Sequence, residues 1–198
     1  MSRIKNMLRT NQTFLDFITK LYEKQERKED VILKQFSKGQ KILIQNDNAS
    51  KVMLMKEGIA KCYFSEENDK EFILEFLGKG EIIGEIECIK NIPCLCNIEA
   101  ITDVSVYALS IPYFQDLLKN NLELNAFLID AFAERIVNTS SRASFQQLYT
   151  VEHSLRKLLE LQSKQDIQLS KEDLAAYLGI SVRSLNRSLK NLNINSEK

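Results

Sequence analysis

The chain has 198 residues, in which 27 lysines and arginines are balanced by 27 aspartates and glutamates. A formal net charge of zero argues against a protein that coats nucleic acid by bulk positive charge. Hydrophobic residues make up 44% and charged residues 27% of the chain, which indicates a folded globular protein. Because His153 is the only histidine, multi-histidine metal enzymes are excluded, and a Ser-His-Asp hydrolase would depend on this one residue.

No stretch approaches the roughly 20 apolar residues that a membrane span needs, and the N-terminus lacks the apolar core of a signal peptide. We therefore expect a cytoplasmic protein whose four cysteines are reduced. Cys94 and Cys96 form the one closely spaced pair, with no second pair or nearby histidine to complete a metal site. No metal and no cofactor are predicted, and thiol sensing by Cys94 or Cys96 is left open.

The N-terminal part of the chain changes from a helical to a β-type pattern. Apolar residues at helical spacing between Phe14 and Tyr22 predict an amphipathic helix. From about residue 31 to 110, short apolar runs interrupted by turn residues predict an all-β sandwich or barrel. The expected strands are residues 41–44, 52–55, 59–64, 71–77, 97–101 and 104–109. Pro112 then opens a short helix that continues through Leu118.

A long helix is expected next, because from Leu124 the helical period runs to about Tyr149 without a glycine or proline. About 25 helical residues would span nearly 40 Å. The apolar stripe is longer than a small β-domain covers, so we expect a dimerisation helix; the alternative is that the chain covers the stripe itself. The expected dimer contacts are Phe132, Ile136, Ala143, Phe145 and Leu148. A further amphipathic helix follows, with leucines from Leu155 to Leu161.

The C-terminal segment has the pattern of a helix, a tight turn and a second helix. Ser170 is suited to cap the first helix, Gly179 to end it in the left-handed conformation, and Ser181 to cap the second helix. Such a unit places its second helix in the DNA major groove, and residues 181–192 hold three cations and no acid. We expect base contacts from Arg183 and Arg187 first and from Ser184 and Asn186 second, a phosphate contact from Lys190, and a further contact from Ser181. The alternative is an ordinary helical hairpin with a solvated basic face.

Two segments carry a resemblance to a known family, EFILEFLGKGEIIGE at 71–85 and LGISVRSLNRSL at 178–189. The chain resembles the Crp/Fnr family of bacterial transcription regulators from about residue 31 to 192. The resemblance implies an α+β fold: an N-terminal β-roll of the cyclic-nucleotide-binding, jelly-roll or cupin-like type with flanking helices, a long dimerisation helix, and an all-α helix-turn-helix domain. The implied domains are a sensor at 1–120, the helix at 121–149, and a DNA-binding domain at 150–198.

The resemblance also implies an effector pocket, in which Gly84 opens a phosphate-binding turn and Glu85 holds the ribose. The arginine that pairs with the cyclic phosphate would fall among residues 93–96, yet no cation stands between Lys90 and Arg135. Losing such a charge-assisted pair costs about 2–4 kcal/mol. We therefore predict that cyclic AMP is not the effector, and that the pocket holds a less anionic ligand or is vestigial. The implied pocket residues are Gly84, Glu85, Ile86, Cys94, Leu95, Cys96, Thr139 and Ser140.

These features predict a non-enzymatic, homodimeric DNA-binding transcription regulator. Its expected partners are a palindromic double-stranded operator and a second copy, with RNA polymerase as a further candidate and no membrane. Residues 193–198 are too short and polar for the β-wing of relatives, so we expect a naturally wingless or a truncated chain with fewer phosphate contacts. The alternative function is a ligand-binding or protein-interaction regulatory module with degenerate DNA binding. A cupin-type enzyme would need several histidine and glutamate metal ligands, which one histidine does not provide.

Overall fold

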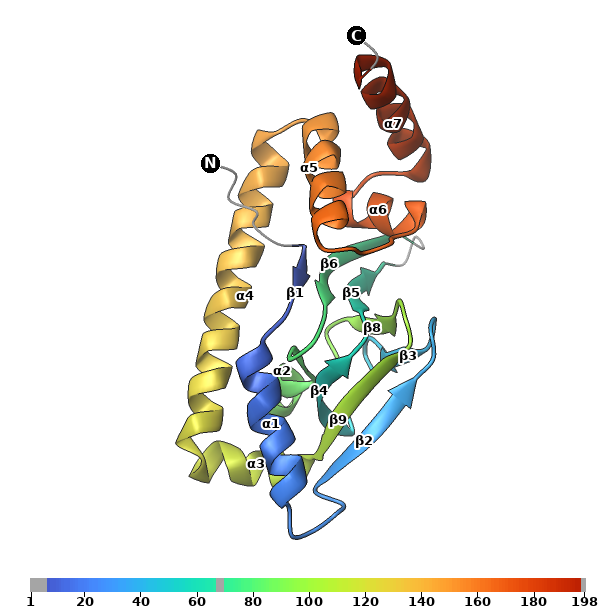
Figure 1. Ribbon diagram of the computed structural model, residues 1–198. Coiled ribbons are helices and arrows are strands. Elements are labelled where there is room, and N and C mark those ends of the chain that lie inside the picture. The colour runs from blue at the N-terminus through green and yellow to red at the C-terminus, as the bar shows by residue number, and fades with distance from the viewer. Residues whose placement is uncertain (1–6, 67–69, 197–198) are drawn as a thin grey trace.

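The computed structural model describes residues 7–66 and 70–196, and has the predicted α+β architecture (Figure 1). A β-sandwich lies beside one long helix, and a three-helix unit covers one end of the sandwich (Figure 1). The elements are β1 (Leu8–Arg9), α1 (Gln12–Lys24), β2 (Val31–Phe36), β3 (Lys41–Leu43), β4 (Lys51–Glu57), β5 (Ala60–Ser65), β6 (Glu71–Leu77), β7 (Ile82–Ile83), α2 (Glu85–Lys90), β8 (Asn97–Ala100), β9 (Val104–Ser110), α3 (Ile111–Asn120), α4 (Leu122–Leu148), α5 (Val151–Lys164), α6 (Lys171–Leu178) and α7 (Val182–Ser196).

The sandwich consists of two sheets, with strand orders β1-β6-β5-β8-β3 and β2-β9-β4-β7. β1 runs parallel to β6, and the other paired strands are antiparallel. Side chains from both sheets form the core between them, among them Met55, Cys62, Ile98 and Val106. A second core lies under α1, α3 and the first half of α4. The strand runs expected from the sequence therefore bury their apolar faces as a sandwich.

Each expected strand and helix is present, with ends that differ by a few residues from the predicted ones. The sequence reasoning did not single out β2, whose residues VILKQF lie before Gly39, the first of the glycines that separate the expected strands. It also missed the two-residue strands β1 and β7 and the six-residue helix α2, which are too short to show a period. Short elements of this kind depend on the sheet and turn around them.

The three-helix unit has the caps that the sequence predicts. Ser170 Oγ accepts a hydrogen bond from the Asp173 amide at 3.0 Å, and Ser181 Oγ accepts one from the Ser184 amide at 3.1 Å. Gly179 ends α6 with φ +68°, which is the left-handed conformation. After Val182 the chain stays helical to Ser196, so within the described residues no strand follows α7.

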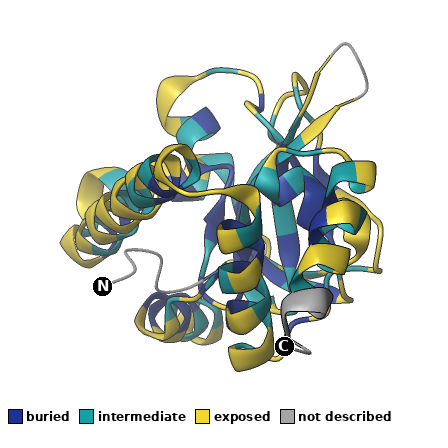
Figure 2. Cartoon of the chain, turned by 90° about the horizontal axis from the view of Figure 1, so that it is seen from above, coloured by how far each residue is buried: buried dark blue, intermediate teal, exposed yellow. Residues whose placement is uncertain are grey.

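The three-helix unit packs directly on the outer face of β5 and β6. Tyr63, Ile73 and Phe76 from the sheet share one apolar cluster with Leu158 and Leu174 of the helices. Lys61 Nζ adds an ion pair with Asp173 Oδ1 at 2.9 Å. Figure 2, viewed along the molecule from above, shows buried residues concentrated in the sheets and exposed residues along the outer helices. The sandwich and the three-helix unit therefore share a continuous interface.

One side chain at this interface extends the sheet. The side-chain oxygen Oε1 of Gln165 accepts hydrogen bonds from the backbone amides of Met7 and Leu8 at 2.9 and 3.1 Å. The side-chain nitrogen Nε2 of Gln165 donates to the backbone carbonyl of Leu8 at 3.1 Å. Gln165 directly follows α5, so the side chain of a helix C-cap pairs with an edge strand.

Among the described helices, none is both long and apolar enough to cross a bilayer.

Candidate effector pocket and nucleic-acid interface

The turn between β7 and α2 positions the first candidate residue, Glu85. Gly84 precedes it with φ +83°, and a Cβ at this position would lie 3.0 Å from the Lys51 carbonyl oxygen. A side chain at residue 84 would thus be strained by both its conformation and its neighbour. The turn directs Glu85, the first residue of α2, into the sandwich, where it is 1% exposed.

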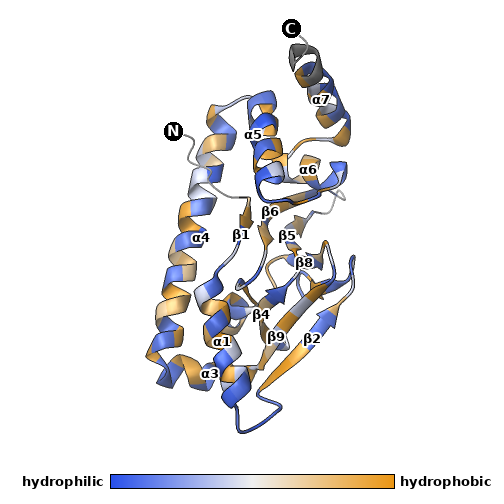
Figure 3. Cartoon of the chain, in the orientation of Figure 1, coloured by the Kyte–Doolittle hydropathy of each residue, from blue (hydrophilic) through white to orange (hydrophobic). Residues whose placement is uncertain are grey.

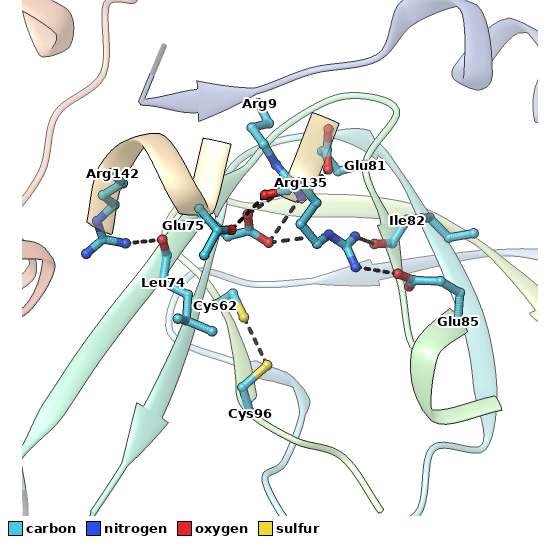
Figure 4. Close-up of polar contacts among 11 residues, drawn as sticks. Arg9, Cys62, Leu74, Glu75, Glu81, Ile82, Glu85, Cys96, Arg135 and Arg142 are labelled. Carbon is cyan, nitrogen blue, oxygen red and sulfur yellow. Dashed lines mark hydrogen bonds and ion pairs between the residues drawn. The ribbon is translucent and has the colours of Figure 1, made fainter. Parts of the chain in front are cut away.

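Arg135 of α4 reaches into this pocket and pairs with Glu85, which the sequence reasoning missed (Figure 4). Its Nη1 lies 2.6 Å from Glu85 Oε1, its Nη2 donates to the Ile82 carbonyl at 3.4 Å, and its Nε is 3.9 Å from Glu75 Oε1. The sequence places Arg135 in the periodic stripe of the long helix and as the next cation after Lys90, without a partner. Its position three residues after Phe132 and seven after Leu128, on the same helix face, was the signal that it faces the protein.

A second arginine completes a buried charge cluster. Arg9 of β1 forms ion pairs with Glu75 at 3.0 Å and with Glu81. Burial raises the pKa of Glu81 and of Glu85, and the charges of Arg9 and Arg135 oppose this rise. Burial alone would lower the pKa of Arg135, but the charges of Glu85 and Glu75 outweigh it and raise that pKa. The guanidinium groups of Arg9 and Arg135 therefore both form ion pairs with carboxylates.

A cavity of about 130 Å³ lies beside the charge cluster. Its lining combines the Glu85–Arg135 pair with mostly apolar side chains, among them Leu74 and Phe64. Of the predicted pocket residues, it contains Gly84, Glu85, Ile86, Leu95 and Cys96. This environment offers apolar contacts and one ion pair. It would oppose a cyclic phosphate, because the anion would approach Glu75 and Glu85 without a free guanidinium.

The remaining predicted pocket residues lie elsewhere. Thr139 and Ser140 line an outer groove of about 570 Å³ between α2 and α4, which shares Ile86 and Arg135 with the inner cavity. Thr139 Oγ1 donates to the Arg135 carbonyl at 2.7 Å within α4. Cys94 is 2% exposed in the sandwich core and does not line either cavity. The structure therefore divides the predicted set between an inner cavity, an outer groove and the core.

The long helix α4 carries a second candidate surface, which is apolar and exposed. Figure 3 shows hydrophobic residues recurring along this helix. The exposed fraction is 67% for Ile136 and 73% for Leu148, and Ala143 is also exposed. Phe132 is half-buried. The large apolar residues Leu122, Ile129 and Val137, which the sequence reasoning did not name, belong to the same exposed set.

Phe145 differs from the expectation that it faces a second copy. It is 5% exposed, and its ring lies 4.5 Å from the Tyr149 ring and 5.6 Å from the His153 ring, measured between centroids. The reason is that α5 turns back against the end of α4, so the chain itself covers this residue. The helical period shows which face is apolar but not which neighbour covers it.

The helix α7 presents the third candidate surface. Arg183, Arg187, Lys190 and Ser181 are exposed, and Ser184 and Asn186 are half-buried. Leu185 on the opposite face is fully buried against the other helices, which fixes the rotation of α7. Ser181 Oγ and Ser184 Oγ are 3.1 Å apart and already hydrogen-bond each other at the cap. The arginines and the lysine therefore form the freely accessible part of this surface.

Residues 33–121 match the model of the cyclic nucleotide-binding domain family. The c-di-GMP-responsive global regulator CLP of Xanthomonas campestris superimposes with a TM-score of 0.74 at 20% identity, over 84% of this chain and 88% of that chain. A transcriptional regulator of the CRP/FNR family from Thermus thermophilus gives a TM-score of 0.72 at 16% identity, over 83% of this chain and 87% of that chain. The chain has the fold of a Crp/Fnr regulator.

The same fold occurs in a CooA variant from Carboxydothermus hydrogenoformans, with a TM-score of 0.71 at 18% identity over 96% of this chain and 88% of that chain. A sequence search among curated proteins gives no significant match. The likeness to the Crp/Fnr regulators therefore concerns the fold.

Proposed function

We propose that this protein is a homodimeric, DNA-binding transcription regulator of the cytoplasm, in which the β-sandwich is a sensor for the helix-turn-helix. The observation that carries the proposal is the α7 surface. Within a Crp/Fnr fold, a capped helix buries Leu185 and exposes Arg183, Arg187 and Lys190. Arginine pairs with guanine edges in the major groove, and lysine pairs with phosphates. RNA polymerase is a further candidate partner.

The exposed face of α4 supports the homodimer. Ile129, Ile136 and Val137 are each at least 60% exposed on one helix, and an apolar surface of this kind favours burial against a partner. Two antiparallel or parallel copies of one helix face make a closed, two-fold interface. A two-fold dimer would present two α7 helices, and we therefore expect a palindromic operator with half-sites about one helical turn apart.

Selection of binding sites from random DNA by the purified full chain tests the proposal. We expect enrichment of a palindrome, and Arg187→Ala should bind the selected site at least tenfold more weakly. Arg156→Ala is the matched control, because Arg156 is an exposed arginine on α5, outside the helix α7. The proposal fails if no palindrome is enriched at moderate salt. Nuclease-insensitive capture of a protein would then favour the protein-interaction module.

Sedimentation equilibrium tests the dimer separately. Ile136→Glu places a charge in the proposed interface and should convert the dimer to a monomer. Leu33→Glu is the control, since Leu33 is 41% exposed on β2, outside α4. A wild-type chain that sediments as a monomer at micromolar concentration would contradict the dimer.

Thermal unfolding with added ligands tests the sensor pocket. Because the guanidinium groups of Arg9 and Arg135 already pair with carboxylates, we expect millimolar cyclic AMP to leave the Tm unchanged. A ligand that binds only the folded state must raise the Tm, so a clear rise with cyclic AMP would overturn this part of the proposal. Small apolar compounds with one polar group are the chemical class that the cavity lining favours.

A further inference from the structure

Two of the four cysteines meet in the floor of the inner cavity. Cys62 Sγ and Cys96 Sγ are 2.9 Å apart and hydrogen-bonded, below the Glu75–Arg135 contact in Figure 4. Both residues line the cavity, so a small molecule that enters it can reach this sulfur pair. Since a disulfide has a bond length of about 2.05 Å, closing this pair needs a movement of only about 0.9 Å.

The strand pairing explains why these sulfur atoms meet. Cys62 lies on β5 opposite Ile98 of β8, and Cys96 directly precedes β8, two residues from Ile98. Side chains two residues apart point to the same face of a sheet, so Cys96 and Cys62 share the face that lines the cavity. A bend at residues 95–96 accompanies this approach. The pairing is thus built by the sheet, although the two cysteines are 34 residues apart in sequence.

The other two cysteines have different surroundings. Cys94, which the C-x-C spacing would pair with Cys96, is buried in the sandwich core. Its amide donates to the Asp47 carbonyl, and its carbonyl accepts from the Asn46 amide, both at 2.8 Å. Cys88 packs against the separate core under α1, α3 and α4. The sulfur–sulfur contact among the described cysteines is the one between Cys62 and Cys96.

We propose that Cys62 and Cys96 form a redox-active dithiol, which hydrogen peroxide converts to an intramolecular disulfide inside the effector pocket. Cys96 is the more exposed of the two sulfur sites, so it reacts first. Its thiolate attacks one peroxide oxygen, the O–O bond breaks and hydroxide leaves, which gives a sulfenic acid at Cys96. Cys62 then attacks the Cys96 sulfur, and the sulfenic oxygen leaves as water with the Cys62 proton.

In the net reaction, two thiols are oxidised to one disulfide, and one hydrogen peroxide is reduced to two waters. The pKa of the Cys62 thiol is raised by its hydrogen bond to Cys96 and by burial, so Cys62 retains its proton until Cys96 has been oxidised. The disulfide would join β5 to the segment before β8 and remove both thiols from the cavity floor. The oxidised pocket would thus differ in shape and polarity from the reduced one.

The test uses the reduced full chain treated with one equivalent of hydrogen peroxide. After denaturation, maleimide-reactive thiols should fall from four to two, and peptide mapping without reductant should find residues 62 and 96 in one linked species. A small thiol should restore all four. Cys62→Ser should instead leave a sulfenic acid at Cys96 that dimedone labels. Cys88→Ser and Cys94→Ser are the matched controls, and each should still lose two of its three thiols.

The wild-type peptide map decides the proposal even if a serine variant does not fold. Four surviving thiols, a Cys94–Cys96 link or a disulfide between two chains would each overturn it. Because the readout is the covalent state of the chain, it is independent of DNA binding. Its failure therefore leaves the proposed regulator function intact, and failure of DNA binding leaves the dithiol intact.

Discussion

Two arginines on the same face of α4, seven residues apart, are held in opposite ways. Arg135 pairs with the carboxylate of Glu85 beside the inner cavity of the sandwich. Arg142, about 10.5 Å further along the helix, donates instead to the backbone carbonyls of Leu74 and Tyr177, and its guanidinium stacks 3.8 Å from the centre of the Tyr177 ring. Burial lowers the pKa of Arg142, whereas the carboxylates raise that of Arg135.

The difference shows what each arginine connects. Arg135 neutralises buried charge and connects α4 to the turn that carries Glu85. Arg142 satisfies carbonyls of β6 and α6, and so ties α4 to both the sandwich and the three-helix unit (Figure 4 shows its contact with Leu74). Removing the first should leave an unpaired charge. Removing the second should deprive the Leu74 carbonyl of this donor and loosen the junction, while the Tyr177 carbonyl keeps its hydrogen bond from Gln146 Nε2 at 3.2 Å. Stability and its pH dependence distinguish these two outcomes.

The largest effect is expected for Arg135→Ala. It leaves Glu85, which is 1% exposed, without its cation, and loss of one partner of a buried ion pair costs about 3–5 kcal/mol of unfolding free energy. Urea unfolding at neutral pH measures this loss. Adding Glu85→Gln should recover part of it, because the unpaired charge is then absent. A double variant no more stable than Arg135→Ala would contradict the charge explanation.

The same variant has a predicted pH dependence. The pKa of Glu85 is raised by burial in the wild-type protein and should rise further without Arg135. A carboxyl with a raised folded-state pKa binds its proton more tightly when folded, so its contribution to stability falls as the pH rises above its ordinary range. The deficit of Arg135→Ala should therefore be larger at pH 8 than at pH 5. An equal deficit at both values would refute this.

Arg142→Ala should cost less, about 2–4 kcal/mol, from lost charge-assisted hydrogen bonds and ring stacking. Its deficit should change little between pH 5 and pH 8, since its acceptors are carbonyls that do not titrate. Hydrogen exchange should increase selectively in β6 and α6, where those carbonyls lie. Arg142→Lys is the conservative variant and should recover only part of the protection, because an ammonium lacks the planar fork of donors. Uniform exchange across the chain would contradict a junction role.

The ion pair at the same junction, Lys61–Asp173, should contribute about 1 kcal/mol in a double-mutant cycle with Lys61→Met and Asp173→Asn. Burial lowers the pKa of Lys61, but Asp173, Glu99 and Glu71 outweigh it and raise that pKa. The pair's contribution is therefore present at neutral pH and is lost as the pH rises through the folded-state pKa of Lys61. A coupling energy of zero at pH 7 would contradict a stabilising role for this ion pair at the junction.

The smallest effect on stability is expected for Arg187→Ala, within about 0.5 kcal/mol, because Arg187 is exposed. Its DNA affinity should nevertheless fall at least tenfold. Stability, from thermal unfolding, and DNA affinity should be measured on the same preparation of Arg187→Ala and compared with the wild type. A large loss of stability would indicate that Arg187 supports the helix-turn-helix rather than DNA contact.

The sequence was informative where the signal is local. Period, caps and the left-handed glycine predicted α4 and the pair α6 and α7, because Ser170, Gly179 and Ser181 act on neighbouring backbone. It was uninformative where distant segments meet. Arg135 faces Glu85 across 50 residues, and Cys62 faces Cys96 across 34. Phe145 was expected at a dimer interface but is covered within the chain by Tyr149 and His153, because a helical stripe does not specify which surface covers it.

The Gln165 side chain described above has a consequence for self-association. An edge strand with unpaired amides and carbonyls is a template for strands of other chains, and proteins protect such edges. Here the side-chain amide of Gln165, at the end of α5, forms hydrogen bonds with the backbone groups of Met7 and Leu8, as a neighbouring strand would. Any movement that carries α5 away from the sandwich exposes this edge. The docked position of the three-helix unit therefore protects the protein from aggregation as well as holding the helix-turn-helix.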